Sequence, residues 1–494
     1  MDPAKQSDIG QGGLRVVIIG AGMAGLLPAI RLSQRGEFDF TIYEKGDTVG
    51  GTWRENHYPG LSCDTPAHEY TYSFARNPEW SAYYAPGPEI QRYFDRVTDR
   101  YGIREHIRFN TEIASCRYAD GRWRIETKDG RQDIADVVIA ATGVLHHPNV
   151  PDIPGLGDFE GDWFHSARWD DSVKLDGARV GVIGNGSTGV QIVSALAERA
   201  AHLVHVIRSP QWIMPCQVKT YTEDEKRVFR EDPAAIEAIC YSPDMLARRN
   251  RFTSAIIDVN SPQLAEIHAL VEKNLEDSVR DPVLRERLRP NYRAACKRLI
   301  FAAHYYDAVQ KPNVAVEVGA IERVEPTGVR MKSGAFHELG VLALATGFKA
   351  DQFVRPMTIT GRGGVDLDEV WAARPKAYYA MTVPDFPNFF LLNGPSGPVG
   401  NFSLVDIAER QWAYIDQLLD LLRGGRCKAI TPKAEALDVY EIARAAAAKR
   451  TVFASGCKSW YLDSEGVPQT WPWSYDHFAE VMAAPRLEDY DLVS

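Results

Sequence analysis

Two glycine-rich turns, each preceded by a run of β-branched residues, constrain the fold of this chain more than any other feature. The first turn occupies residues 20–25 and the second occupies residues 184–189. Each turn follows a continuous apolar run, typical of a strand buried on both faces of a parallel sheet, and each opens a stretch with helical apolar periodicity. A second short apolar strand then follows in both copies, over residues 40–43 and 203–207. This internal repeat predicts two βαβ units of the dinucleotide-binding type.

Later strands and a helical segment complete the expected organisation. Each half contains an apolar strand that ends in Ala-Thr-Gly, at residues 137–143 and 341–347. Between Thr220 and Arg289 the sequence is charged and helix-like, which predicts a helical insertion in the second unit. A chain of 494 residues is too long for a single core. The expected division is residues 1–147 and 381–494 for the first nucleotide-binding domain, residues 148–215 and 296–380 for the second, and residues 216–295 for the insertion.

The glycines of the two turns are candidates for binding a diphosphate. In a βαβ unit they permit a tight turn and close approach of the ligand, and the helix amino terminus stabilises the negative charge. One such motif is weak support, but both copies here lie between a predicted strand and a predicted helix. The alternative, two purely structural turns, is hard to sustain twice. The candidate cofactor-binding residues of the turns are Gly20, Gly22, Gly25, Gly184, Gly186, Ser187, Thr188 and Gly189.

The residues at the ends of the second strands distinguish the two ligands. Glu44 lies nineteen residues after Gly25, where a carboxylate can bind the ribose hydroxyls of an adenosine. Arg208 lies nineteen residues after Gly189, and its guanidinium favours a 2′-phosphate. The first site therefore indicates FAD or NAD and the second indicates NADP, although Arg208 could also be a solvated charge at a strand end. The expected fold class is α/β, with two Rossmann-like dinucleotide-binding domains and a helical insertion in the NADP domain.

Composition and charge exclude several other classes of protein. A net charge of −10 argues against a nucleic-acid partner. Asp2 and Asp8 make the first dozen residues unlike a secretory signal, and no apolar stretch is long enough to span a membrane. The seven cysteines are scattered, so we expect neither a zinc site nor a disulfide framework, and no His/Asp/Glu cluster has metal-ligand spacing. These features predict a cytoplasmic protein without a metal or a membrane contact.

Four segments resemble a known family of flavoenzymes. Residues 46–58, Gly-Asp-Thr-Val-Gly-Gly-Thr-Trp-Arg-Glu-Asn-His-Tyr, resemble the FAD-binding segment of flavin-containing monooxygenases. Residues 159–170, Phe-Glu-Gly-Asp-Trp-Phe-His-Ser-Ala-Arg-Trp-Asp, resemble the fingerprint of type I Baeyer–Villiger monooxygenases. The sister enzymes that oxidise amines and sulfides tend to lack its Trp-Asp ending. Lys297-Arg298 and residues 459–461, Ser-Trp-Tyr, match the same pattern. The matches run in family order along nearly all of the chain and are weakest in the helical insertion.

The resemblance implies an NADPH- and O₂-dependent flavoprotein that acts on ketones. In this family NADPH reduces FAD, the reduced flavin captures O₂ as a C4a-peroxide, and the peroxide attacks a ketone carbonyl to give an ester or lactone. Arg298 occupies the family's position for a fixed cation that stabilises the peroxide and the negative adduct, a role that suits a guanidinium because it stays protonated when buried. Asp64 matches the carboxylate that pairs with this arginine. The expected substrate is an apolar ketone, cyclic or aryl.

The resemblance also assigns residues to the cofactors and to the connection between the domains. Lys297 and Arg208 match residues that hold the 2′-phosphate of NADPH. Trp460 matches a tryptophan on the substrate and nicotinamide side of the pocket, whereas His165 and Trp169 belong to a linker that couples the two halves during the catalytic cycle. The further candidate cofactor-binding residues are Gly51, Thr52, Trp53, Asp64, Gln191, Ser209, Ala345, Thr346 and Gly347.

Other functions remain open at this stage. A flavin monooxygenase that oxidises nitrogen or sulfur is a close alternative, and a non-catalytic FAD-binding protein is a remote one. A disulfide reductase also has paired nucleotide domains, but it needs a close cysteine pair beside the first domain, where only Cys63 is present. The identity of the ketone is not determined by the sequence, and the oligomeric state could be a monomer or a homodimer.

Overall fold

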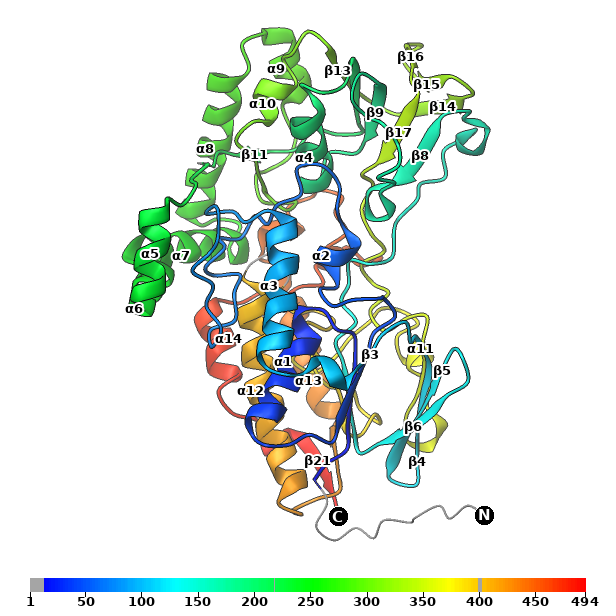
Figure 1. Ribbon diagram of the computed structural model, residues 1–494, viewed down its shortest axis with the longest axis vertical. Helices are drawn as coiled ribbons and strands as arrows, with labels where there is room; N and C mark the ends of the chain where they lie inside the picture. Colours follow the sequence, from blue (N-terminus) through cyan, green and yellow to red (C-terminus); the bar gives the residue numbers. More distant parts are fainter. Residues whose placement is uncertain (1–12, 217, 399–401) are drawn as a thin grey trace.

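The protein consists of two lobes that are stacked along its longest axis (Figure 1). The computed structural model describes residues 13–216, 218–398 and 402–494. The amino-terminal stretch with Asp2 and Asp8, on which the predicted localisation depends, lies outside these residues. Each lobe is built on a five-stranded, all-parallel sheet. The predicted α/β class with two Rossmann-like units is therefore confirmed.

The first sheet occupies the lower lobe in Figure 1 and has the strand order β19-β7-β1-β2-β3. All four residues of β1 are buried, as expected for a central strand covered on both faces. Helix α1 (Met23–Gln34) starts within the glycine-rich turn, directly after Gly22. The edge strand β19 comes from the carboxy-terminal part, so the chain returns to complete this sheet. The strands are β1 (Val16–Ile19), β2 (Phe40–Tyr43), β3 (Ile107–Arg108), β7 (Val137–Ala140) and β19 (Phe389–Leu391).

The second sheet repeats this arrangement in the upper lobe, with the order β13-β10-β9-β17-β8. Its three middle strands, β17-β9-β10, correspond to β7-β1-β2 of the first sheet, and α4 (Ser187–Leu196) corresponds to α1. The internal repeat read from the two glycine turns is thus a repeat of structure. The strands are β8 (Asp162–His165), β9 (Arg179–Ile183), β10 (His202–Ile207), β13 (Val314–Val318) and β17 (Val341–Leu344).

The predicted insertion is helical and lies on the outer side of the upper lobe, in green in Figure 1. Serine or aspartate side chains cap the amino termini of several of its helices, and a proline follows each of these caps in the first turn. The short parallel strands β11 and β12 border it. The elements are β11 (Ile213–Met214), α5 (Glu223–Glu231), α6 (Pro233–Cys240), α7 (Pro243–Ile257), α8 (Pro262–Ser278), α9 (Pro282–Leu288), β12 (Ile300–Phe301) and α10 (Tyr305–Ala308).

Two smaller sheets are attached to the parallel ones, and the first of them packs on the first lobe. Strand β18 pairs with β4, and Val354, Ile359 and Trp371 pack in one core with Val17 of the first lobe. Residues 354–371, which the predicted division gives to the second nucleotide-binding domain, thus pack with the first lobe. The cause is a long-range pairing that leaves no local pattern. The elements are β4 (Ile113–Ala119), β5 (Arg122–Thr127), β6 (Gln132–Ala135), β18 (Thr358–Thr360) and α11 (Leu367–Val370), and in the second sheet β14 (Ile321–Glu325), β15 (Gly328–Met331) and β16 (Phe336–Glu338).

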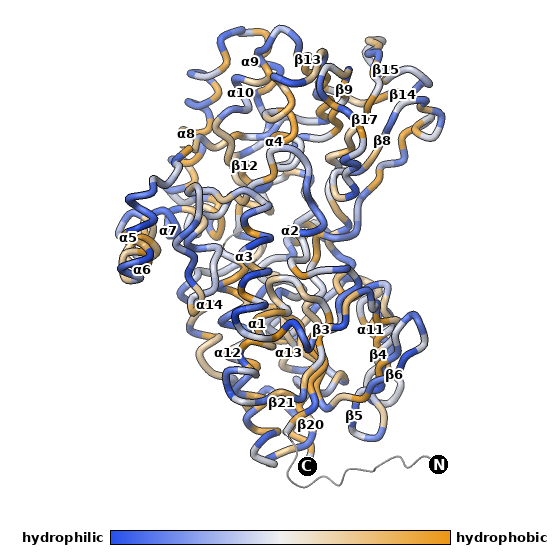
Figure 2. Tube along the Cα trace, viewed as in Figure 1, coloured by the Kyte–Doolittle hydropathy of each residue, from blue (hydrophilic) through white to orange (hydrophobic). Residues whose placement is uncertain are grey.

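Helices from both ends of the chain cover the first sheet. Hydrophobic residues follow the parallel strands, whereas the outer helix α5 is mostly hydrophilic (Figure 2). No helix within the described ranges is long and apolar enough to cross a membrane. The remaining elements are α2 (Thr52–Glu55), α3 (Gly87–Arg100), α12 (Leu404–Arg423), β20 (Ala429–Pro432), α13 (Ala434–Ala448), α14 (Tyr475–Val481) and β21 (Tyr490–Val493).

A disulfide contradicts the expectation drawn from the cysteines. Cys296 and Cys457 are bonded, although 161 residues separate them in the sequence. Both are buried in the core that the second sheet shares with the insertion. The spacing of the seven cysteines gave no sign of this pair because the packing of two distant segments brings them together. The other five cysteines are free thiols.

Candidate active site

Each glycine turn packs against its own helix and against the end of the later Ala-Thr-Gly strand. A Cβ added to Gly25 would lie 1.8 Å from the carbonyl oxygen of Gly20, and one added to Gly189 would lie 1.9 Å from that of Gly184. A Cβ on Gly184 would also lie 2.3 Å from the carbonyl oxygen of Ala345. Only glycine fits at these contacts, so both helices begin close to the ends of their strands. The helix amino termini therefore lie at the carboxyl edge of each sheet, where nucleotides bind in this fold.

The first turn opens into a cavity whose walls come from both ends of the chain. Glu44 is buried and accepts hydrogen bonds from the backbone N–H of Ala21 (2.8 Å) and Gly46 (2.7 Å), and from Arg54 Nη1 (2.8 Å). The carboxylate is thereby fixed beside the glycine turn. A glycine cradle next to a fixed carboxylate fits the diphosphate and adenosine of FAD. The predicted residues that line this cavity are Gly20, Gly22, Glu44, Gly51, Thr52 and Trp53.

The second turn is open in the same way, but two of its predicted residues contact the first lobe. A Cβ added to Gly186 would meet no atom within 4 Å, which leaves room for a diphosphate beside the start of α4. Thr188 Oγ1 donates to the hydroxyl of Tyr58 (3.3 Å), and Gln191 Nε2 donates to the carbonyl of Ser62 (3.0 Å). These side chains fasten α4 to residues 58–62 of the first lobe. Ser187 is the first residue of that helix.

Two cations lie together beyond the end of β10. Lys297 Nζ donates to Ser209 Oγ (3.2 Å), and Arg208 is exposed nearby. Burial lowers the pKa of Lys297, and the positive charge of Arg208 lowers it further. Neither side chain forms an ion pair with a carboxylate in the described part of the chain. Two adjacent cations without a carboxylate partner fit a phosphate, which supports the predicted site for the 2′-phosphate of NADPH.

Arg298 and Asp64 form an ion pair across the junction of the two lobes. Arg298 Nη2 donates to both carboxylate oxygens (2.7 and 2.8 Å), and Nε donates to Oδ2 (3.2 Å). Asp64 belongs to the loop after Pro59-Gly60, and Arg298 lies just before β12. The negative charge of Asp64 raises the pKa of Arg298, so the guanidinium is permanently charged. The structure thus brings together the two residues predicted to be catalytic.

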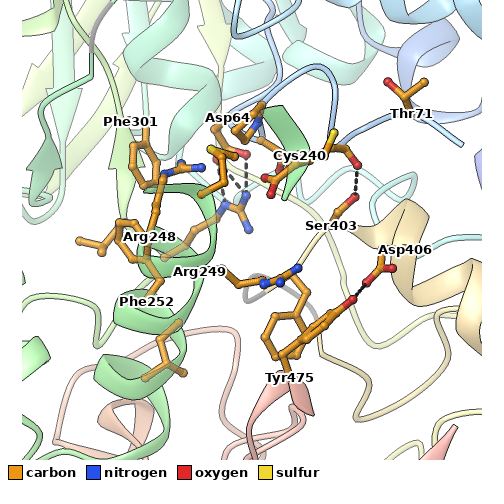
Figure 3. A pocket seen from close by; sticks show the side chains of 18 of the residues that line it. Asp64, Thr71, Cys240, Arg248, Arg249, Phe252, Phe301, Ser403, Asp406 and Tyr475 are labelled. Atoms are coloured by element: carbon orange, nitrogen blue, oxygen red, sulfur yellow. Dashed lines mark hydrogen bonds and ion pairs between the residues drawn. The ribbon is translucent and has the colours of Figure 1, made fainter. Parts of the chain in front are cut away.

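A cavity opens beside this ion pair, with walls from the first lobe, the insertion and the carboxy-terminal helices (Figure 3). Of the Arg298 side chain, 38% is exposed, against 16% of that of Asp64, so the guanidinium faces the open space. Tyr461 also lines this cavity, and its hydroxyl interacts with Arg298. A fixed cation at the wall of a cavity can stabilise negative charge that develops on a bound substrate.

The structure places Trp460 beside the cavity rather than in its wall. Trp460 is 51% exposed and stacks on Tyr461, with 4.1 Å between the ring centroids. Tyr461, its neighbour in the predicted Ser-Trp-Tyr segment, is the residue that reaches Arg298. Sequence reasoning missed Tyr461, although the segment itself was the signal. The disulfide between Cys296 and Cys457 ties this segment to the residues directly before Lys297 and Arg298.

His165 and Trp169 lie at the edge of the second sheet, away from the cavity at Arg298. His165 Nδ1 accepts from the backbone N–H of Ala167 (3.1 Å), so its Nε2 carries the proton and donates to the carbonyl of Gly347 (3.0 Å). Burial lowers the pKa of His165 and favours this neutral form. Trp169 packs edge-on against Phe164 of β8, with 4.7 Å between centroids. His165 therefore fixes one Ala-Thr-Gly turn to the segment that connects the lobes.

Two arginines of the insertion also line the cavity at Arg298, and sequence reasoning missed them. Arg248 and Arg249 are adjacent on α7. The resemblance gives no correspondence in the insertion, so an Arg-Arg pair on a charged helix gave no specific signal. The last predicted residue, Thr346, donates from Oγ1 to the carbonyl of Asn149 (2.7 Å) and stabilises the turn after β17.

Comparison with known proteins agrees with this geometry. A model of the flavin-binding monooxygenase-like family matches residues 13–354. An uncharacterized monooxygenase of Mycobacterium tuberculosis is 42% identical over 479 residues, which cover 97% of this chain and 96% of the relative. A Baeyer–Villiger monooxygenase of Streptomyces coelicolor is 35% identical over 486 residues, which cover 97% of this chain and 93% of the relative.

Solved structures with the same architecture match nearly the whole chain. Cyclohexanone monooxygenase from Rhodococcus sp. Phi1 bound to NADP⁺ superposes with a TM-score of 0.85 at 28% identity, covering 98% of this chain and 99% of that one. The complex of OTEMO with FAD and NADP gives a TM-score of 0.87 at 26% identity, covering 98% and 100%. The chain therefore belongs to the flavin-binding monooxygenase-like family and, within it, to the Baeyer–Villiger monooxygenases, as its motifs predicted.

Proposed function

We propose that the protein uses FAD, NADPH and O₂ to convert a ketone to an ester or lactone. The balanced reaction is ketone + O₂ + NADPH + H⁺ → ester + NADP⁺ + H₂O. The observation that carries the proposal is the ion pair of Arg298 with Asp64, which lies at the wall of a cavity between two nucleotide-binding units. The bound flavin supplies the transfer of electrons from NADPH and the activation of O₂.

The side chains have separate tasks in this reaction. Arg298 offers a charge that it does not lose as a proton, and this charge stabilises the negative charge that develops at the reacting carbonyl. Asp64 orients the guanidinium through three contacts of 3.2 Å or less. Lys297 and Arg208 bind the 2′-phosphate of NADPH, which selects it over NADH. Glu44 binds the adenosine ribose of FAD.

Product analysis tests the proposal directly. Purified holoprotein is incubated with NADPH and ¹⁸O₂ and either a cyclic ketone, an aryl ketone, an aryl sulfide or an amine, and the products are identified by mass spectrometry. We expect an ester or lactone that carries one ¹⁸O atom. Oxidation of the sulfide or amine without any ester would assign the protein to nitrogen or sulfur oxidation instead. Bound FAD without consumption of NADPH would indicate a non-catalytic flavoprotein.

A further inference from the structure

The cavity beside Arg298 contains a second group of positive charges, supplied by the helical insertion. Arg248 and Arg249 on α7 line the same cavity as Arg298 and Asp64. Arg249 extends from its helix toward Ser403 and Tyr475, and Arg248 lies on the side of Phe252 and Phe301 (Figure 3). The arrangement differs from that at Arg298, where a carboxylate neutralises the guanidinium.

Neither of these arginines has a carboxylate partner among the described residues. Arg248 donates to the hydroxyl of Tyr84 (3.3 Å), and its guanidinium carbon lies 5.4 Å from the centre of the Phe301 ring. Arg249 lies over the ring of Tyr475 at 4.4 Å. The Nε of Arg249 is buried and has no hydrogen-bond acceptor in the ranges that the structure describes. A buried N–H of a charged group is costly when it is left without an acceptor, so this atom points to a ligand.

Two of the carboxylates in the cavity wall are already engaged. Asp406 accepts from the hydroxyl of Tyr475 (2.5 Å) and pairs with Arg410 at 3.4 Å. Glu409 accepts from both the backbone N–H and the hydroxyl of Ser73, at 2.9 and 3.1 Å. Neither carboxylate forms an ion pair with an arginine of α7 within the described ranges.

The remaining carboxyl group of the wall, apart from Asp64, is that of Glu69. It lies in the field of Arg248 and Arg249, but it forms an ion pair with neither within the described residues. Burial raises its pKa and weakens it as a counter-ion. Glu69 is the carboxyl group on which the charges of both Arg248 and Arg249 act, whereas neither acts on Glu409. Even with Glu69 fully ionised, the group formed by Glu69 and these two arginines keeps one positive charge. A ligand with a single negative charge neutralises it, whereas a phosphate dianion would leave a net negative charge in the cavity.

The cavity that holds the arginines of α7 and Arg298 also has apolar side chains in its wall. These apolar residues are Met245, Phe252, Ile256, Phe301, Phe402 and Phe453. A molecule that fits has a polar reactive end, a hydrophobic body and a monoanionic end. We propose that the substrate is a keto acid, whose carbonyl lies at Arg298 and whose carboxylate is bound by Arg249 with Arg248 beside it. This inference rests on the proposed ketone oxidation and names its substrate class.

A matched series of substrates tests the inference. Straight-chain methyl ketones of increasing length, each ending in a carboxylate, are compared with their methyl esters, and ester formation is measured with holoprotein and NADPH. At the best length we expect kcat/KM for the acid to exceed that for its methyl ester by about tenfold or more, because one charge-assisted contact strengthens binding by about that factor. The difference should lie mainly in KM. In Arg249→Gln this ratio should fall close to one, and Arg249→Lys should retain part of it.

A control on the same helix separates binding from general effects of charge. Arg251 lies on α7 but not in the cavity wall, so Arg251→Gln should keep the ratio of the wild type. A second measurement does not depend on turnover: calorimetric titration of holoprotein with octanoate should show binding that weakens about tenfold in Arg249→Gln, while octanol should not distinguish the two proteins.

The outcomes separate this inference from the proposed function. Equal oxidation of acids and methyl esters, or equal binding of octanoate to wild type and Arg249→Gln, would overturn the inference and leave ketone oxidation standing. Octanoate binding that depends on Arg249, without oxidation of any ketone, would support the anion site and overturn the proposed reaction.

Discussion

Replacement of Arg298 by alanine should strongly slow oxygenation while leaving the reduction of the flavin by NADPH intact. The guanidinium is a preorganised charge, and removal of one such group from an active site costs about 2.7–4 kcal/mol of transition-state stabilisation. Because 38% of the Arg298 side chain is exposed, water screens part of its effect, and the lower end of this range applies. We therefore expect ester formation to fall by about 100-fold, which corresponds to ~3 kcal/mol.

Two rates must be measured separately in this experiment. Stopped-flow absorbance follows the reduction of the flavin by NADPH, and mass spectrometry follows the ester. Arg298→Lys keeps a positive charge but loses the two-pronged contact with Asp64, so its loss should be smaller. Asp64→Asn keeps the arginine but removes its counter-ion, and we expect uncoupled turnover in which NADPH is consumed with less ester.

The result that refutes the reasoning is ester formation by Arg298→Ala at the rate of the wild type. A loss of flavin binding or of the folded state would instead show that the ion pair is structural. Comparison of flavin content and thermal unfolding of the four proteins distinguishes this case, because Arg298→Lys and Asp64→Asn preserve the volume of the site.

Three further predictions concern the cofactors and the disulfide. Arg208→Gln should raise KM for NADPH by about tenfold or more but leave KM for NADH nearly unchanged, and equal changes would remove the argument for the 2′-phosphate. The pKa of Lys297 lies below its usual 10.5, so Lys297 loses its charge at a lower pH than an ordinary lysine does. Affinity for NADPH should therefore begin to fall at that lower pH, which a pH series of KM will reveal. Cys457→Ser should lower the free energy of unfolding by ~2–5 kcal/mol, because the bridge to Cys296 joins residues that are 161 positions apart in the sequence. Free thiols at both positions in peptide maps of the non-reduced protein would contradict the bridge.

The repeat was predictable from the sequence because its causes are local. A buried parallel strand, a glycine turn and an amphipathic helix each leave a pattern within about twenty residues. Glycine is required at positions 25 and 189 because of close contacts with Gly20 and Gly184, which lie in the same βαβ unit. The pairing of Arg298 with Asp64 was expected only by resemblance, since 234 residues separate them. The pairing of β18 with β4 and the bridge between Cys296 and Cys457 left no pattern, because both depend on how distant segments pack.

The cavity wall combines residues beside the two repeated nucleotide-binding units with residues of the helical insertion. This division indicates that reactivity and selectivity depend on different parts of the chain. Asp64 and Arg298 lie next to the two nucleotide-binding units, so the charge that serves the reaction is held by the framework that positions the cofactors. Arg248 and Arg249 lie on α7 of the insertion, where the resemblance to the family is weakest. Changes in the insertion can therefore alter which ketone binds without moving the ion pair. On this argument, substitutions on the cavity face of α7 should change the order of preferred ketones, whereas substitutions at the ion pair should slow all of them alike.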